Sequence, residues 1–114
     1  MKLSEKLCWV YITVGSLEEA KKISKQLVAQ NLAACINLLE KMTSIYKWED
    51  KLEEDQEVIM IVKTRKTLMP KLVETVNSKH SYDCPCILEF PIQGGNPEFL
   101  SWIVTETVDP EEQQ

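Results

Sequence analysis

Residues 33–64 read AACINLLEKMTSIYKWEDKLEEDQEVIMIVKT, which is the pattern of a β-hairpin with long arms. Residues 33–47 and 58–64 are rich in β-branched and aromatic side chains, which favour strands. The charged residues 49–56 between them predict a polar tip. Leu38 and Leu39 break the alternation of the first arm, so they predict a bulge or a change of buried face.

These arms are long for so small a domain. At roughly 3.3 Å per residue they span about 40 Å, more than strands usually do. Their outer part carries the large side chains Ile45, Tyr46, Trp48 and Leu52. Because strands that outrun their own sheet commonly pair with another chain, we expect a homo-oligomer. The alternative is a curled hairpin that folds back on its own domain.

Capping signals predict three helices around the hairpin. Ser16 caps the first helix, and Glu19 three residues later completes a capping box. Thr67 is expected to cap the second, whose first turn tolerates Pro70 because that position has no helical N–H partner. Asn96 and the proline after it begin the third.

The order of the elements predicts the fold class. Residues 7–14 and 86–91 are the remaining strand candidates, which gives β-α-β-β-α-β followed by a C-terminal helix. With right-handed crossovers, this order forms an α+β ferredoxin-like sandwich, a four-stranded antiparallel sheet with helices on one face. The 114 residues are expected to form one domain with a core of about residues 8–108 and a polar tail at 109–114.

Composition narrows the possible partners. The net charge is −5 and no basic stripe is present, so no nucleic-acid partner is expected. The apolar runs fall short of the ~20 residues of a membrane span, and the N-terminus does not resemble a signal peptide. Four cysteines are too few for a secreted disulfide scaffold, which favours reduced thiols and a cytoplasmic location.

Five motifs follow one another along most of the chain: LAACIN (32–37), SIYKWEDKLEEDQE (44–57), KT (63–64), H-x-Y-D-x-P (80–85) and GNPEFLSWI (95–103). Together they resemble the CutA family, the divalent-cation tolerance proteins. The resemblance implies a ferredoxin-like subunit in a tight homotrimer, with hairpins crossing subunit boundaries. It also implies a link to copper and other divalent cations, and the fold and trimer are similar to the PII signalling proteins.

Three departures from the family pattern stand in or near these motifs. Residues 80–83 read HSYD where the family usually has H-P-Y-E, and residues 85–87 read PCI where it usually has P-E-I. A thiol therefore replaces a carboxylate at Cys86. At the hairpin turn Asp50 replaces the usual glycine, which should alter only the turn.

Most of the candidate metal ligands lie within residues 80–86, close to the departure at Cys86. His80 is the only histidine, and imidazole suits copper or zinc, while Asp83 is placed to ligate the ion or to orient the ring. The thiols of Cys84 and Cys86 favour Cu(I) or Zn²⁺. Against this, a single C-P-C is not a recognised zinc spacing, and the helix dipole also explains a histidine at a helix end. We expect copper or zinc and no organic cofactor.

Cys35 at the start of the long strand is a further candidate, so the predicted ligand set is His80, Asp83, Cys35 and Cys86. The competing interpretation is a small buried core residue, a common role of free cysteine. A Cys35–His80 catalytic pair is a further alternative, but the sequence offers neither an orienting group nor an oxyanion hole. We therefore expect a protein that is not an enzyme.

Tyr46, Trp48, Glu57, Lys63 and Tyr82 are the polar and aromatic residues of the matching motifs. The resemblance places residues of this kind around a cleft between subunits. Lys63 stands in an otherwise apolar strand and needs a partner, for which Glu57 is the candidate. The alternative is a structural interfacial ion pair with aromatic packing.

The sequence thus predicts a homotrimeric, non-catalytic protein of CutA type that binds divalent cations, copper in particular. Its expected partners are other copies of itself and metal ions, and the sequence names no other protein partner. The alternative is a trimeric signalling or scaffold protein, PII-like by analogy, which binds a small ligand or a partner protein in the cleft.

Overall fold

The computed structural model describes residues 5–108, so the predicted polar tail at 109–114 lies outside them. One sheet has the strand order β2-β3-β1-β4, and each neighbouring pair is antiparallel. The strands are β1 (Leu7–Val14), β2 (Cys35–Trp48), β3 (Lys51–Arg65) and β4 (Ile87–Ile92). This order confirms the predicted ferredoxin-like fold.

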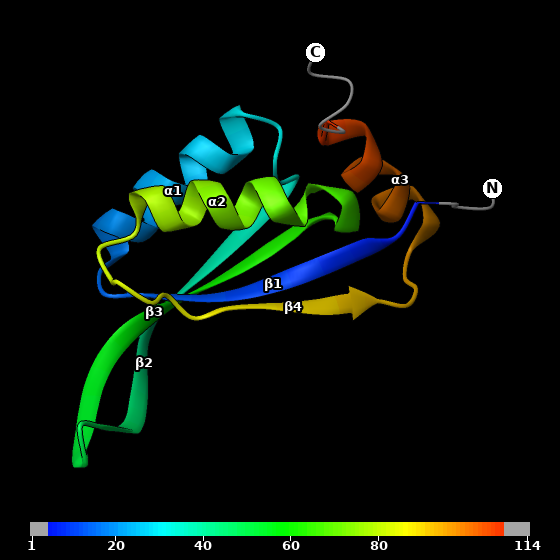
Figure 1. Cartoon of the computed structure of the whole chain (residues 1–114). Coiled ribbons are helices and arrows are strands. Elements are labelled where there is room, and N and C mark those ends of the chain that lie inside the picture. Colours follow the sequence, from blue (N-terminus) through cyan, green and yellow to red (C-terminus); the bar gives the residue numbers. More distant parts are fainter. Residues whose placement is uncertain (1–4, 109–114) are drawn as a thin grey trace.

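Three helices accompany the sheet: α1 (Leu17–Ala29), α2 (Met69–Lys79) and α3 (Pro97–Glu106). The first two lie side by side over one face, and α3 lies at the end of the sheet away from the hairpin tip (Figure 1). No helix within residues 5–108 is long and apolar enough to cross a membrane.

Two of the three predicted caps are present. The Ser16 hydroxyl accepts a bond from the Glu19 N–H at 3.2 Å, and the Asn96 side chain accepts one from the Glu98 N–H at 3.1 Å. The expected cap at Thr67 is wrong. A short 3-10 turn precedes α2 there, and no side chain caps the helix.

The helix-covered face holds the main core. Val10, Ile12, Met60 and Val62 point to this side, and all of them are fully buried beneath α1 and α2. Complete burial of one such side chain contributes about 1.5–3 kcal/mol, so this face provides most of the stability of a single chain.

The opposite face is also apolar, but α3 covers only one end of it. There, Leu7 and Ile103 form a small second core with Ala34. Beyond α3 the face is open, and Leu39 and Leu88 are each 51% exposed. We call the side chains on this side of the sheet that α3 leaves uncovered the open face. They include Trp9, Asn37, Leu39, Ile59, Ile61, Leu88 and Phe90.

The hairpin of β2 and β3 projects away from the body (Figure 1). The predicted break in alternation is confirmed, because the register shifts between Leu39 and Met42. The expected charged tip at residues 49–56 is wrong, since strand pairing continues to the Trp48–Lys51 pair and leaves a two-residue turn. The alternative of a hairpin folded back on its domain is wrong too. Trp48 is 63% exposed and Leu52 is 76% exposed on this arm.

Arg65 fastens the C-terminal end of α3 to the end of β3. Its buried guanidinium donates to the carbonyls of Val104 and Thr107, both at 2.7 Å, and to the Thr107 hydroxyl at 2.8 Å. An ion pair with Glu5 at 3.3 Å compensates the charge. Because the last carbonyls of a helix lack helical partners, Arg65 supplies a hydrogen bond at the end of α3 and adds to the one that the Val104 carbonyl accepts from the Thr107 N–H at 3.3 Å.

Candidate functional site

A cleft of about 500 Å³ opens where the hairpin leaves the body. Its lining comes from β1, from the hairpin between Glu57 and Trp48 near its tip, and from the segment between α2 and β4. The lining residues are Thr13, Tyr46, Trp48, Glu57, Tyr82, Asp83, Cys84 and Cys86. The structure thus brings together six of the predicted site residues, and it leaves His80, Cys35 and Lys63 outside this lining.

Two tyrosines and two carboxylates form the polar part of the cleft and its rim. The Tyr82 hydroxyl donates to Glu57 at 3.0 Å, and the Tyr46 hydroxyl donates to Asp55. Burial and the Glu57 hydrogen bond raise the pKa of Tyr82 to about 12, and the Asp55 bond raises the pKa of Tyr46 to about 12. At neutral pH both tyrosines are therefore hydrogen-bond donors, and the carboxylates accept.

His80 lies behind the cleft, and both of its ring nitrogens are engaged. Its Nε2 is 2.8 Å from the Thr13 carbonyl, and its Nδ1 is 3.1 Å from the Tyr82 N–H. A carbonyl can only accept and an N–H can only donate, so the ring is neutral and carries its proton on Nε2. The side chain is fully buried. In this position His80 anchors the Tyr82 backbone rather than presenting a free nitrogen to the cleft.

Glu19, on α1, holds the segment between α2 and β4 in place. Its carboxylate accepts from the Ser81 N–H and the Ser81 hydroxyl, each at 2.8 Å, and it lies 3.6 Å from the His80 Nδ1. The sequence identified Glu19 only as half of a capping box with Ser16. Its side chain instead bonds a residue 62 positions away, a contact for which the sequence carries no signal.

Lys63 and Cys35 lie further along the strands, away from the cleft. The Lys63 ammonium donates to the Asn37 side chain and is 3.9 Å from the Cys35 sulfur. Glu57 lies six residues away along β3, or about 20 Å, so it does not pair with Lys63 within one chain.

The alternative of a Cys35–His80 catalytic pair is not formed within the chain either. Cys35 is paired with Lys63 across β2 and β3, and Lys63 is paired with Trp9 on β1. His80 bonds Thr13, which lies four residues, or about 13 Å, further along β1. No step that needs both side chains at one atom is therefore available in this chain.

The thiol and carboxylate donors of the cleft differ in exposure. Cys84 is exposed, whereas Cys86 is half-buried, and both are free thiols. Burial and the negative charge of Glu57 raise the pKa of Cys86, against a smaller effect of a hydrogen bond with Thr13. Within residues 5–108, no three His, Cys, Asp or Glu side chains are grouped closely enough to form a ready-made metal site.

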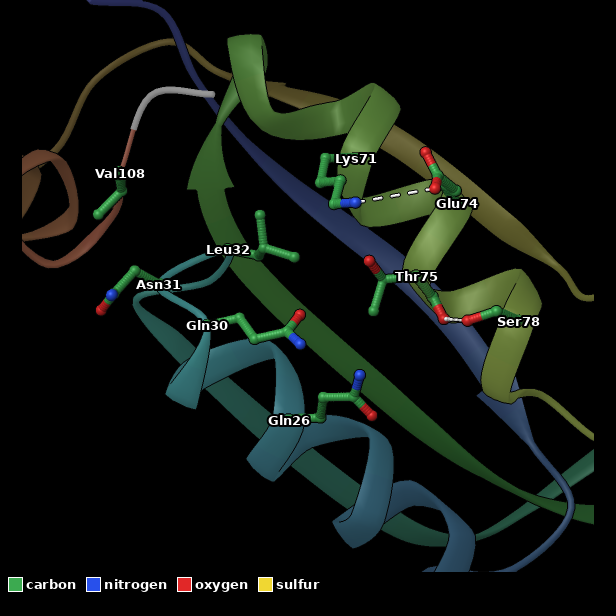
Figure 2. A pocket seen from close by; sticks show the side chains of 9 residues that line it. All are labelled: Gln26, Gln30, Asn31, Leu32, Lys71, Glu74, Thr75, Ser78 and Val108. Atoms are coloured by element: carbon green, nitrogen blue, oxygen red, sulfur yellow. Dashed lines mark hydrogen bonds and ion pairs between the residues drawn. The ribbon is translucent and has the colours of Figure 1, made fainter. Parts of the chain in front are cut away.

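A second hollow lies between α1 and α2, and Figure 2 shows its lining. Most of the side chains there are amides and hydroxyls, and its two charged groups, Lys71 and Glu74, lie 3.7 Å apart and compensate each other. None of the predicted site residues lines it. The hollow therefore offers no unbalanced charge to a cation.

The fold and the cleft are those of an α+β ferredoxin-like protein with a projecting hairpin. Residues 8–106 match the family described as CutA1 divalent ion tolerance protein. The chain therefore belongs to the CutA family, as its motifs predicted.

Known relatives agree with this assignment. The divalent-cation tolerance protein CutA of Thermus thermophilus is 46% identical over 98 residues, which cover 86% of this chain and 95% of the relative. Its solved structure has a TM-score of 0.87 at 44% identity and covers 90% of this chain and 99% of that one. The crystal structure of CutA1 from Oryza sativa has a TM-score of 0.90 at 36% identity, covering 92% of this chain and 96% of that one.

The match to several eukaryotic relatives is partial. Protein CutA of Mus musculus is 43% identical over 100 residues, which cover 86% of this chain but 56% of the relative. The chain thus spans about half the length of the plant and mammalian relatives that it matches.

Proposed function

We propose that this chain is a non-catalytic, homotrimeric protein that binds copper or zinc in the cleft between its hairpin and the segment that joins α2 to β4. The carrying observation is that the carboxylates of Glu57 and Asp83 and the thiol of Cys86 line one cavity. Oxygen and sulfur donors together suit transition-metal ions. The chain is not expected to be an enzyme, and its expected location is the cytoplasm.

The donors fit such an ion in type, although they do not form a complete set within one chain. Of the four predicted ligands, Asp83 and Cys86 line the cleft, whereas Cys35 lies elsewhere on the sheet and both His80 nitrogens are engaged. An ion held in the cleft completes its coordination with Glu57, with water or with groups of a neighbouring copy. Bound copper or zinc supplies a positive charge that these carboxylates compensate.

The homotrimer rests on two surfaces that a single chain leaves uncovered. The open face exposes Leu39 and Leu88, and the arm exposes Trp48 and Leu52. Contiguous apolar surface of this kind marks an interaction site. A second copy of the chain is the simplest partner, because identical copies supply the same apolar surfaces.

Light scattering coupled to size exclusion at micromolar concentration tests the assembly, with an expected mass of three times the 13.1 kDa chain. A monomer would contradict it.

Calorimetric titration with Cu(II) and Zn²⁺ tests the cleft. Asp83→Asn and Glu57→Gln should each weaken binding more than tenfold, or by about 1.4 kcal/mol. Asp50→Asn, a carboxylate at the hairpin turn, is the matched control and should bind like the wild type. Equal binding by all four proteins would place the ion elsewhere.

A further inference from the structure

Two thiols of the same short segment line the cleft, and only one of them, Cys86, belongs to the predicted ligand set. Cys84 and Cys86 are separated by Pro85, and both line the cavity together with Asp83 and Glu57. Both are free, and neither takes part in the anchoring of this segment through His80.

The proline restricts how the two thiols are spaced. Its ring fixes its own φ, and the chain bends at Cys84 before it. Both side chains line the same cavity. A disulfide between residues only two positions apart would close a very short loop, which strains its geometry.

A metal ion suits this short spacing better than a disulfide does. A disulfide brings its sulfurs to about 2.0 Å, whereas an ion bound about 2.3 Å from each sulfur tolerates a separation roughly twice as large. The pair is therefore better suited to bind an ion than to form a bridge.

The charges around the pair favour a cation. Glu57 and Asp83 are acidic, and none of the eight residues that line the cleft is lysine or arginine.

We propose that Cys84 and Cys86 form a dithiolate site that binds one Cu(I) ion per chain, with Glu57 and Asp83 supplying negative charge around it. This inference rests on the proposed cation-binding function of the same cleft. Binding forms two copper–sulfur bonds and releases the two thiol protons to solvent, with no change in oxidation state. Soft thiolates select Cu(I), and the lack of a grouped third or fourth donor within residues 5–108 disfavours structural zinc, which takes four ligands.

The test is an anaerobic Cu(I) titration of the reduced full-length protein against a chromogenic Cu(I) chelator. Wild type should take up one Cu(I) per chain and show a thiolate-to-copper absorption band in the ultraviolet. Cys84→Ser and Cys86→Ser should each weaken Cu(I) binding more than tenfold and lose the band. Cys35→Ser is the matched control, because its thiol is also half-buried but lies outside the cleft, and it should keep both properties.

The outcomes separate this inference from the function on which it rests. If Cys84→Ser and Cys86→Ser bind Cu(I) like the wild type, the dithiolate site is wrong. In that case, continued Cu(II) or Zn²⁺ binding that Glu57→Gln weakens would leave the proposed function intact. If the wild type binds none of the three ions, the proposed function fails and the inference fails with it. Circular dichroism verifies that each variant is folded, and Cys84→Ala provides a second substitution at the exposed position.

Discussion

The helix-covered face and the open face alternate along the same strands and are both apolar, yet only the first is buried within one chain. On β1, Val10 and Ile12 are completely buried, whereas on β4 Leu88 faces the other way and is half exposed. A strand that is apolar on both sides is typical of a sheet covered on both sides. This contrast indicates that a single chain lacks the second cover, and a neighbouring copy is the cover we propose.

The largest expected effect comes from placing a charge on the open face. Leu88→Glu should abolish the proposed trimer, because a carboxylate would be buried without a partner at the interface. Val28→Glu is the matched control, because Val28 is a similarly exposed apolar residue, but on α1. Light scattering should show smaller particles for Leu88→Glu alone. If Leu88→Glu retains the mass of the wild type, the open face is not the interface.

The end of the opposite face that α3 covers should instead respond to loss of an internal contact. Arg65→Lys removes most of the bonds to the Val104 and Thr107 carbonyls and should lower the free energy of unfolding by about 1–3 kcal/mol. Lys66→Arg, one residue further and exposed, should leave it nearly unchanged. Urea denaturation of the two variants measures the difference. Equal stabilities would show that Arg65 does not secure α3.

Tyr82, which lines the cleft, should make the free energy of unfolding fall at alkaline pH. Its pKa is about 12 in the folded chain and 10.0 ordinarily. Between these values the unfolded chain loses a proton that the folded chain retains, so this stabilisation is complete below pH 10 and disappears as pH rises towards 12. Tyr82→Phe should therefore show a shallower fall in unfolding free energy over this interval.

The hydrogen-bond partner of Tyr82 provides the control. Glu57→Gln keeps the tyrosine but removes the negative charge, so it should lower the pKa of Tyr82, measured by the absorbance of tyrosinate. An unchanged titration in Glu57→Gln would show that the Glu57 carboxylate does not raise this pKa. Identical slopes for wild type and Tyr82→Phe would show that Tyr82 does not cause the alkaline loss of stability.

The smallest effect is expected at the tip of the arm. Glu49 and Asp50 both have positive φ, 50° and 64°, a backbone conformation that favours glycine. Asp50→Gly should raise the free energy of unfolding by a few tenths to about 1 kcal/mol. Glu54→Gly, in the paired strand, should lower it by about 0.5–1 kcal/mol. If thermal unfolding shows the same sign for both variants, strain at the turn is not the reason.

Much of the cleft could be predicted from the sequence, because its residues stand in motifs of the family. Tyr46 and Trp48 come from one motif, and Tyr82 and Asp83 come from another. Cys84 was visible as part of C-P-C. The role of His80 could not be predicted, because one of its partners is the main-chain carbonyl of Thr13, and every residue has such a group. The Asn37 partner of Lys63 could not be predicted either, because it comes from the neighbouring strand, and the candidate Glu57 shares a face of β3 but lies about 20 Å away within one chain.

Local signals in the sequence were enough to define the elements and their order, because strand alternation, helix caps and turn residues act over a few neighbouring positions. They also predicted that the hairpin outruns its domain, since strand length follows from residue count. Which side chains meet depends instead on the tertiary structure. The Glu19–Ser81 contact joins residues 62 positions apart, and the engagement of both His80 nitrogens depends on how α2 ends against β1. Such contacts arise from the packing of helices against a sheet, which no short stretch of the chain encodes.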